Sequence, residues 1–120
     1  MKRITRTAAL AGMAAAFALN AAPAAAQDDD RQFLYCVASA ADPGGKAYFT
    51  KVYPGTWDQS PEDEEAYFNH IASKVDEDVE RSTTYCYTLD TFDEAGLDRE
   101  EGVDVIRESG WEPVEIAWRP

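Results

Sequence analysis

Two cysteines constrain this chain more than any other feature. Cys36 lies in the run FLYCVASA (33–40) and Cys86 lies in the run TTYCYTL (83–89). Both runs are rich in the aromatic and β-branched residues typical of strands. The chain of 120 residues has no other cysteine, so only one internal disulfide is available. Whether that disulfide forms depends on the compartment in which the chain folds.

The start of the chain has the three-part layout of a secretory signal peptide. Three basic residues come first, an alanine-rich apolar stretch follows at 8–19, and Ala24 and Ala26 form an A-x-A cleavage site. A membrane anchor is the alternative, but the apolar stretch is short for ~30 Å of hydrocarbon. We therefore predict a Sec-type signal peptide (1–26), cleavage after Ala26, no membrane insertion afterwards, and a periplasmic or secreted location.

Export favours a structural disulfide between Cys36 and Cys86, because disulfides persist in oxidising compartments. The chain-entropy model gives about 4 kcal/mol for a loop of this length. Two alternatives have less support. A redox-active pair is typically a C-x-x-C motif, which the sequence lacks, and two thiols without nearby histidines are too few for zinc.

The charge of the chain limits its partners. All 23 acidic residues follow position 26, whereas three of the 11 basic residues precede it. The net charge is −12 for the whole chain and about −15 for the processed chain, which keeps 8 basic residues. Nucleic acid and anionic lipid would be repelled by such a charge, so we expect no nucleic-acid partner. A basic partner or divalent cations remain compatible with it.

The processed chain is predicted to contain a disordered amino-terminal segment (27–32) and a single α+β domain (33–120). Residue periodicity and turn residues predict the order β-β-α-β-α-β. The predicted strands are 33–39, 47–53, 83–89 and 112–118. The first predicted helix runs from a capping Ser60 to about Val79. The second starts at Thr91, which with Glu94 has the capping-box spacing, is kinked or broken near Gly96, and ends at Gly110 as a left-handed cap.

These elements predict a four-stranded mixed sheet with both helices on one face. Right-handed crossovers over one face allow the strand orders 2-1-3-4 and 1-2-3-4. A disulfide between the first and third strands needs these strands to be neighbours, which favours 2-1-3-4. In this arrangement Cys36 and Cys86 would lie on the face without helices, and Tyr85 and Tyr87, which alternate with Cys86, would lie on the face that the helices cover.

Several short motifs together resemble a small module found in exported bacterial proteins. They are YCVASA, AYFTKVYPG, a cysteine after the first helix, DEAGLDRE and GWEPVEIAW. The module ends in a Glu-Thr-Gly-Trp pattern, where this chain has Glu115-Ile116-Ala117-Trp118. The family has no established activity, so the resemblance implies an exported small domain and no catalytic residues.

Catalytic chemistry finds little support in the residues. His70 is the only histidine and borders an apolar stripe, so we interpret it as a structural residue. The chain has no G-x-S-x-G elbow and no Gly-rich phosphate loop, and we predict no catalytic residue, cofactor or metal ligand. The acidic runs 76–80 and 98–101 leave calcium binding open, although a solvated acidic face explains them more simply. A small hydrolase using paired carboxylates is a further alternative.

Four aromatic residues are least explained by the predicted core: Tyr48, Tyr53, Trp57 and Trp111. They would suit a binding platform for a peptide or sugar ring on the open sheet face or at its edge. The alternative is that they complete a small core around the disulfide. We therefore predict an exported, monomeric, non-enzymatic interaction or accessory domain. Its partner would be a protein, a peptide or a glycan.

Overall fold

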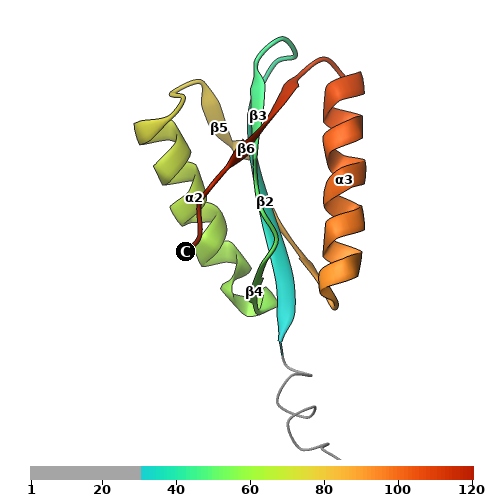
Figure 1. The fold of residues 1–120 in the computed structure, drawn as a ribbon. Coiled ribbons are helices and arrows are strands. Elements are labelled where there is room, and N and C mark those ends of the chain that lie inside the picture. The colour runs from blue at the N-terminus through green and yellow to red at the C-terminus, as the bar shows by residue number, and fades with distance from the viewer. Residues whose placement is uncertain (1–30) are drawn as a thin grey trace, which may run out of the picture. The chain divides into compact units, whose positions relative to one another are not determined.

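Residues 31–120 are described by a computed structural model, which has two helices and a curled, mixed sheet (Figure 1). The predicted signal peptide and positions 27–30 of the predicted disordered segment lie outside these residues. Gln32, the last position of that segment, already belongs to the first strand. The elements in chain order are β2 (Gln32–Ala40), β3 (Lys46–Thr50), β4 (Tyr53–Gly55), a 3-10 turn η2 (Trp57–Gln59), α2 (Ser60–Lys74), β5 (Val79–Leu89), α3 (Phe92–Glu108) and β6 (Glu112–Ile116).

The central strand is β2, which has antiparallel neighbours along both edges. Along one edge it pairs with β5 over most of its length, with Cys36 opposite Cys86. Along the other edge its two halves pair with β3 and β4. The outermost strand, β6, runs parallel to β3. The α+β class, the mixed sheet and the single domain predicted from the sequence are confirmed.

The predicted strand order was wrong at the last strand. The observed order is β5-β2-β3-β6, so the final strand joins the second strand of the chain rather than the third. The predicted second strand also divides into β3 and β4. At the division the Thr50 hydroxyl accepts the Cys36 N–H at 2.9 Å, replacing a backbone ladder bond.

The two helices cover opposite faces of the sheet, which corrects the prediction of one shared face (Figure 1). The connection through α2 runs from β4 to β5, and the connection through α3 runs back across the sheet from β5 to β6. Because crossovers of one hand that travel in opposite directions place their helices on opposite faces, this strand order requires helices on both sides.

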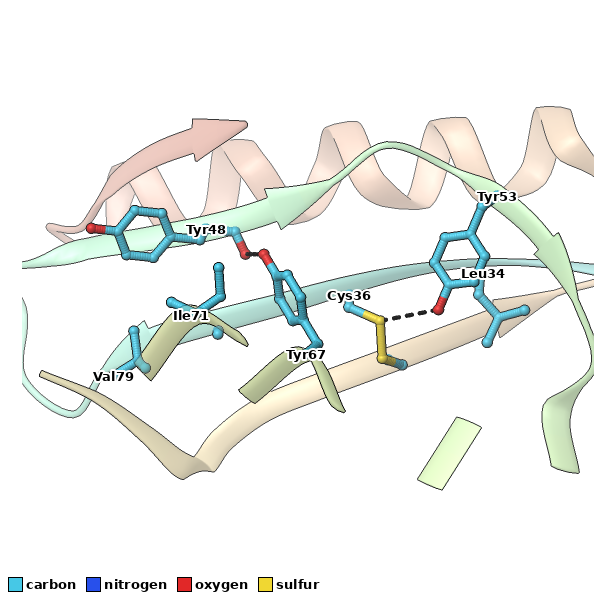
Figure 2. Close-up of a cluster of buried hydrophobic side chains, with 9 residues drawn as sticks. Leu34, Cys36, Tyr48, Tyr53, Tyr67, Ile71 and Val79 are labelled. Atoms are coloured by element: carbon cyan, nitrogen blue, oxygen red, sulfur yellow. Dashed lines mark hydrogen bonds between the residues drawn. A yellow bond between two sulfur atoms is a disulfide. The ribbon is translucent and has the colours of Figure 1, made fainter. Parts of the chain in front are cut away.

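The core beneath α2 contains the disulfide. Cys36 and Cys86 are bonded with a Cα–Cα distance of 4.0 Å, which confirms the predicted pairing. They lie beneath α2 with Leu34, Tyr67 and Ile71, not on an open face (Figure 2). The Tyr67 hydroxyl is fully buried and donates to the Tyr48 carbonyl at 2.8 Å.

A second core lies between the sheet and α3. It contains Tyr35, Val37 and Phe49 from the strands, with Val103 and Ile106 packed against them. Alternate residues of β2 point to opposite faces, so this strand contributes apolar side chains to both cores. Arg99 fixes α3 against the sheet, because it donates to the Thr50 carbonyl at 2.6 Å and to Glu115 at 2.9 Å.

The helix ends differ in part from the sequence prediction. The first helix ends at Lys74, and Val79 starts β5 instead. Ser60 is the first residue of α2 rather than its cap, a position that Gln59 occupies, and the Ser60 hydroxyl donates to the Cys86 carbonyl. For α3, the Thr91 hydroxyl accepts the Glu94 N–H as predicted, but the helix runs through Gly96 without a break. Gly110 has a φ of 109°, which confirms the left-handed turn after α3.

Candidate functional site

A hollow of about 480 Å³ lies between α3 and the face of β2 and β5. We call it the α3–β5 groove. Side chains from both strands form its floor, α3 forms one wall, and the other side is open. The groove is defined by Tyr35, Val37 and Ser39 of β2, by Thr83, Tyr85 and Tyr87 of β5, by Asp98, Glu101, Gly102, Val105 and Ile106 of α3, and by Ala41, Phe49 and Trp111.

The floor of the groove is aromatic. The rings of Tyr35 and Tyr87 lie 5.2 Å apart, and those of Tyr87 and Tyr85 lie 6.2 Å apart. Because α3 packs over Tyr35, Val37 and Phe49, it leaves the outer strand partly uncovered. Tyr85 and Tyr87 are consequently 48% and 43% exposed. The three tyrosines thus form a continuous row from the buried centre of the sheet to its surface.

The α3 wall is acidic. Asp98 accepts a hydrogen bond from the Tyr35 hydroxyl at 2.6 Å, and Glu101 lies one helical turn further along the same wall. Burial, with the bond to Asp98, raises the pKa of Tyr35 above its ordinary value. Burial also raises the pKa of Tyr87. Both tyrosines therefore remain neutral hydrogen-bond donors at physiological pH.

Two further residues, Val105 and Ser39, indicate that the described residues leave space for a ligand in the groove. Val105 of α3 is 59% exposed although it is apolar. Ser39 is only 6% exposed and lines the groove, yet its hydroxyl makes no hydrogen bond to any residue within 31–120. A buried polar group normally has a partner, so the Ser39 hydroxyl is available to one that enters the groove.

A second hollow of about 430 Å³ adjoins the groove and shares Asp98 and Glu101 with it. It lies between the end of β5 and the first turns of α3. Its other lining residues include Asp90, Glu94 and Leu97. Neither hollow has a lysine or arginine in its lining. The seam between α3 and β5 is therefore apolar and aromatic at one end and acidic at the other.

The structure does not bring together the four aromatic residues proposed from the sequence. Tyr48 and Tyr53 are buried in the core beneath α2. Trp57 is 68% exposed on the 3-10 turn, outside both hollows. Trp111 lines the α3–β5 groove, where its ring nitrogen donates to the Ala40 carbonyl at 3.0 Å. Of the four, only Trp111 belongs to the candidate site.

The buried tyrosines beneath α2 are held by carboxylates. The Tyr53 hydroxyl donates to Asp63 at 2.9 Å and lies 3.3 Å from the Cys36 sulfur (Figure 2). Burial raises the pKa of Asp63, and burial together with a bond to Asp76 raises that of Tyr48 to about 12. Asp63 is buried and accepts the Tyr53 bond next to the disulfide, so we assign this network to the packing around Cys36.

The other residues considered for chemistry lie apart from one another. His70 is half-buried, with its ring 6.4 Å from that of Trp118. Within the described part of the chain, no group of three or more His, Cys, Asp or Glu side chains is placed to hold a metal ion. In the run 76–80, Asp76 accepts hydrogen bonds from Tyr48 and from the Asp78 N–H. Neither helix of residues 31–120 has the length and apolar character of a membrane span.

Comparison of the chain with protein-family models, curated protein sequences and solved structures found no match. The motif resemblance to an exported bacterial module therefore has no matching family model behind it. The candidate site is defined by its own residues and geometry.

The sequence analysis missed the groove because it placed Tyr85 and Tyr87 beneath the helices. The alternation of β5 correctly put both tyrosines on one face, opposite Cys86. It could not show how far a helix on that face would extend over the edge strand. A useful indication was available in α3 itself, where Leu97 and Val105 interrupt its acidic surface and are both exposed in the structure.

Proposed function

We propose that this protein is an exported, disulfide-stabilised interaction domain that binds a partner protein through the α3–β5 groove and catalyses no reaction. The observation that carries the proposal is the gathering of Tyr85, Tyr87 and Val105, all more than two-fifths exposed, around one hollow. Exposed apolar side chains that cluster around a concavity are typical of interaction sites. Tyrosine in particular supplies apolar contact area together with a hydrogen-bonding group.

The proposal of export rests on two independent features. One is the layout of the first 26 residues, with a cleavage motif ending at Ala26. The other is the disulfide between Cys36 and Cys86, a bond that is rare where thiols are kept reduced.

Fractionation of cells that express the full chain tests this part of the proposal. We expect the protein in the exported fraction, with Gln27 as its first residue and with neither thiol reactive towards a maleimide. Full-length protein in the cytoplasm with two reactive thiols would contradict export.

The binding part is tested by substitutions on two exposed apolar residues. Val105→Glu places a charge at the open side of the groove, whereas Trp57→Glu places the same charge outside both hollows. Affinity capture from the exported fraction should recover a protein with wild type and with Trp57→Glu but not with Val105→Glu. That protein is then purified and titrated by calorimetry against all three proteins, after equal thermal stability of the variants has been established.

An interface outside the groove would give a different result. If the purified partner binds Val105→Glu as tightly as wild type, the groove is not the binding site. A catalytic role would instead appear as turnover of a partner or small molecule that depends on Asp98 or Glu101.

A further inference from the structure

The shape of the α3–β5 groove indicates what kind of ligand it takes, and this inference rests on the function proposed above. Tyr35, Val37 and Ser39 lie along the groove at alternate positions of β2, and Ala41 lies in the bend just past the end of the strand. At about 3.3 Å per residue, the six steps from Tyr35 to Ala41 span at most roughly 20 Å. One amino-acid side chain cannot fill a hollow of this length, whereas about six residues of extended chain would.

The charge of the seam favours a basic ligand. Asp90, Glu94, Asp98 and Glu101 line the two adjoining hollows, with no basic side chain among the lining residues of either. None of the salt bridges within residues 31–120 involves these four carboxylates, so no basic side chain of the described residues neutralises them. Complementary charge speeds encounter and excludes like-charged competitors, so acidic segments would be rejected.

The aromatic floor suits the same ligand. Lysine and arginine have apolar stems and cationic ends, and their cations bind favourably over the faces of tyrosine rings. The exposed rings of Tyr87 and Tyr85 provide such faces, next to the buried Tyr35 and its partner Asp98. Apolar residues of the ligand would contact Val105 and Trp111 at the other end of the groove.

Addition of the ligand as a further strand on β5 is disfavoured by the side chains that already occupy this edge. The Cys86 N–H donates to Glu64 at 3.0 Å, and the Cys86 carbonyl accepts from Ser60 at 3.2 Å. The Thr84 carbonyl accepts from Arg81 at 3.3 Å. These three backbone groups in the middle of the edge are therefore already engaged, and we expect an extended ligand to bind through its side chains and the Ser39 hydroxyl.

A second copy of this chain fits the groove poorly. Two molecules of net charge −12 repel each other, and the seam of each presents carboxylates. We propose that the α3–β5 groove binds an extended segment of about six residues from a partner protein, with lysine or arginine at the acidic end and apolar or aromatic residues at the end near Trp111.

Binding of defined peptides to the oxidised, processed protein tests this proposal. The probe is a fluorescein-labelled octapeptide that combines arginine with leucine and tryptophan. The matched controls are the same peptide with glutamate or with glutamine in place of arginine, and the neutral oligosaccharide cellotetraose. Fluorescence anisotropy gives the affinity of the peptides at low and at physiological salt. Amide chemical-shift changes locate each ligand, including the oligosaccharide.

Two pairs of isosteric substitutions separate local from overall charge. Glu94→Gln with Glu101→Gln removes two charges from the seam, whereas Glu100→Gln with Glu108→Gln removes two from parts of α3 outside both hollows. Since partly exposed ion pairs are individually weak, we expect about a threefold loss of affinity for each seam carboxylate and about tenfold for the pair. The control pair should change affinity less than twofold.

The outcomes distinguish this inference from the proposed function. The inference is supported by two results together. Only the arginine peptide changes the amide chemical shifts of Tyr35, Tyr87 and Gly102, and the seam substitutions lower its affinity. It fails if the glutamate or glutamine peptide, or cellotetraose, binds the groove equally well, or if no peptide binds at millimolar concentration. In those cases a partner that is lost with Val105→Glu would still uphold the proposed function, whereas a partner insensitive to that substitution would refute it.

Discussion

Removal of the disulfide should lower the free energy of unfolding. The expected loss is about equal to the free-energy contribution of the conformational entropy that the link removes from the unfolded chain. The bonded cysteines are separated by 50 residues in sequence. For a loop of this length the chain-entropy model gives about 4 kcal/mol at 25 °C. A domain of this size has a total stability of about 5–15 kcal/mol, so the loss is a large fraction. Each kcal/mol of lost stability lowers the midpoint of thermal unfolding of a small domain by about 4–8 °C, so the midpoint should fall by roughly 20 °C.

The measurement compares three forms of the protein by urea unfolding followed by circular dichroism. They are the oxidised wild type, the wild type reduced with a phosphine, and the variant with Cys36→Ala and Cys86→Ala. Reduction removes only the covalent link, whereas the double variant also leaves space beside Leu34 and Tyr67. Both forms should lose about 4 kcal/mol, and the double variant somewhat more. A loss below about 1 kcal/mol in both would refute the claim that the link stabilises the fold by restricting the unfolded chain.

Three further perturbations have expected outcomes that equilibrium unfolding can measure. Gly102→Ala should stabilise α3 by about 1 kcal/mol, because the new methyl group would lie 3.6 Å from the Tyr35 hydroxyl and 3.7 Å from Phe49 without a clash; a loss of stability would contradict that packing. Gly110→Ala should instead cost about 1–2 kcal/mol, since its φ of 109° strains any side chain and Pro43 lies 3.1 Å from the new atom. Burial raises the pKa of Asp63, so the folded protein favours the protonated carboxyl. The contribution of Asp63 to the free energy of unfolding is therefore greatest at low pH and declines as the pH rises above the usual aspartate pKa. Asp63→Asn should therefore gain stability relative to wild type between pH 3.5 and pH 7, and a constant difference between the two proteins over that range would show that Asp63 is not perturbed.

The element order and the disulfide could be predicted because they depend on local patterns. Aromatic and β-branched residues in 33–39 and 83–89 identified two strands, and the signal-peptide layout with an even cysteine count indicated the disulfide between them. The capping residue Thr91 fixed the start of α3 for the same reason. None of these predictions required knowledge of which strands lie side by side.

The strand order could not be predicted because it depends on a choice between faces. The handedness rule allows two crossovers that advance together over one face and equally two that reverse over both faces. The residues of β2 contained the deciding information. Leu34, Cys36 and Ala38 are buried on one face, and Tyr35 and Val37 on the other. A strand that is apolar on both faces is typical of a sheet covered on both sides.

The candidate site was harder to predict than the fold. Tyr48 and Tyr53 had no assigned place in the predicted core, because the sequence analysis assigned too few residues to the core beneath α2. Both are buried and bonded to carboxylates in that core. Tyr85 and Tyr87 looked buried because alternation gives the face of a residue but not the extent of the helix above it. The groove follows from that extent, which only the packing of α3 determines.

The most direct test of the α3–β5 groove as the site for a basic, extended segment is to locate such a segment on the protein. A nitroxide label on the arginine-containing octapeptide would broaden the amide signals of residues near it in the oxidised, processed protein. We expect broadening at Tyr35, Tyr87, Asp98 and Gly102, on the α3 side of the sheet, and none at Tyr67 or Ile71 beneath α2. Broadening confined to the α2 side or to the outer edge of β6 would contradict the proposal that the α3–β5 groove is the binding site.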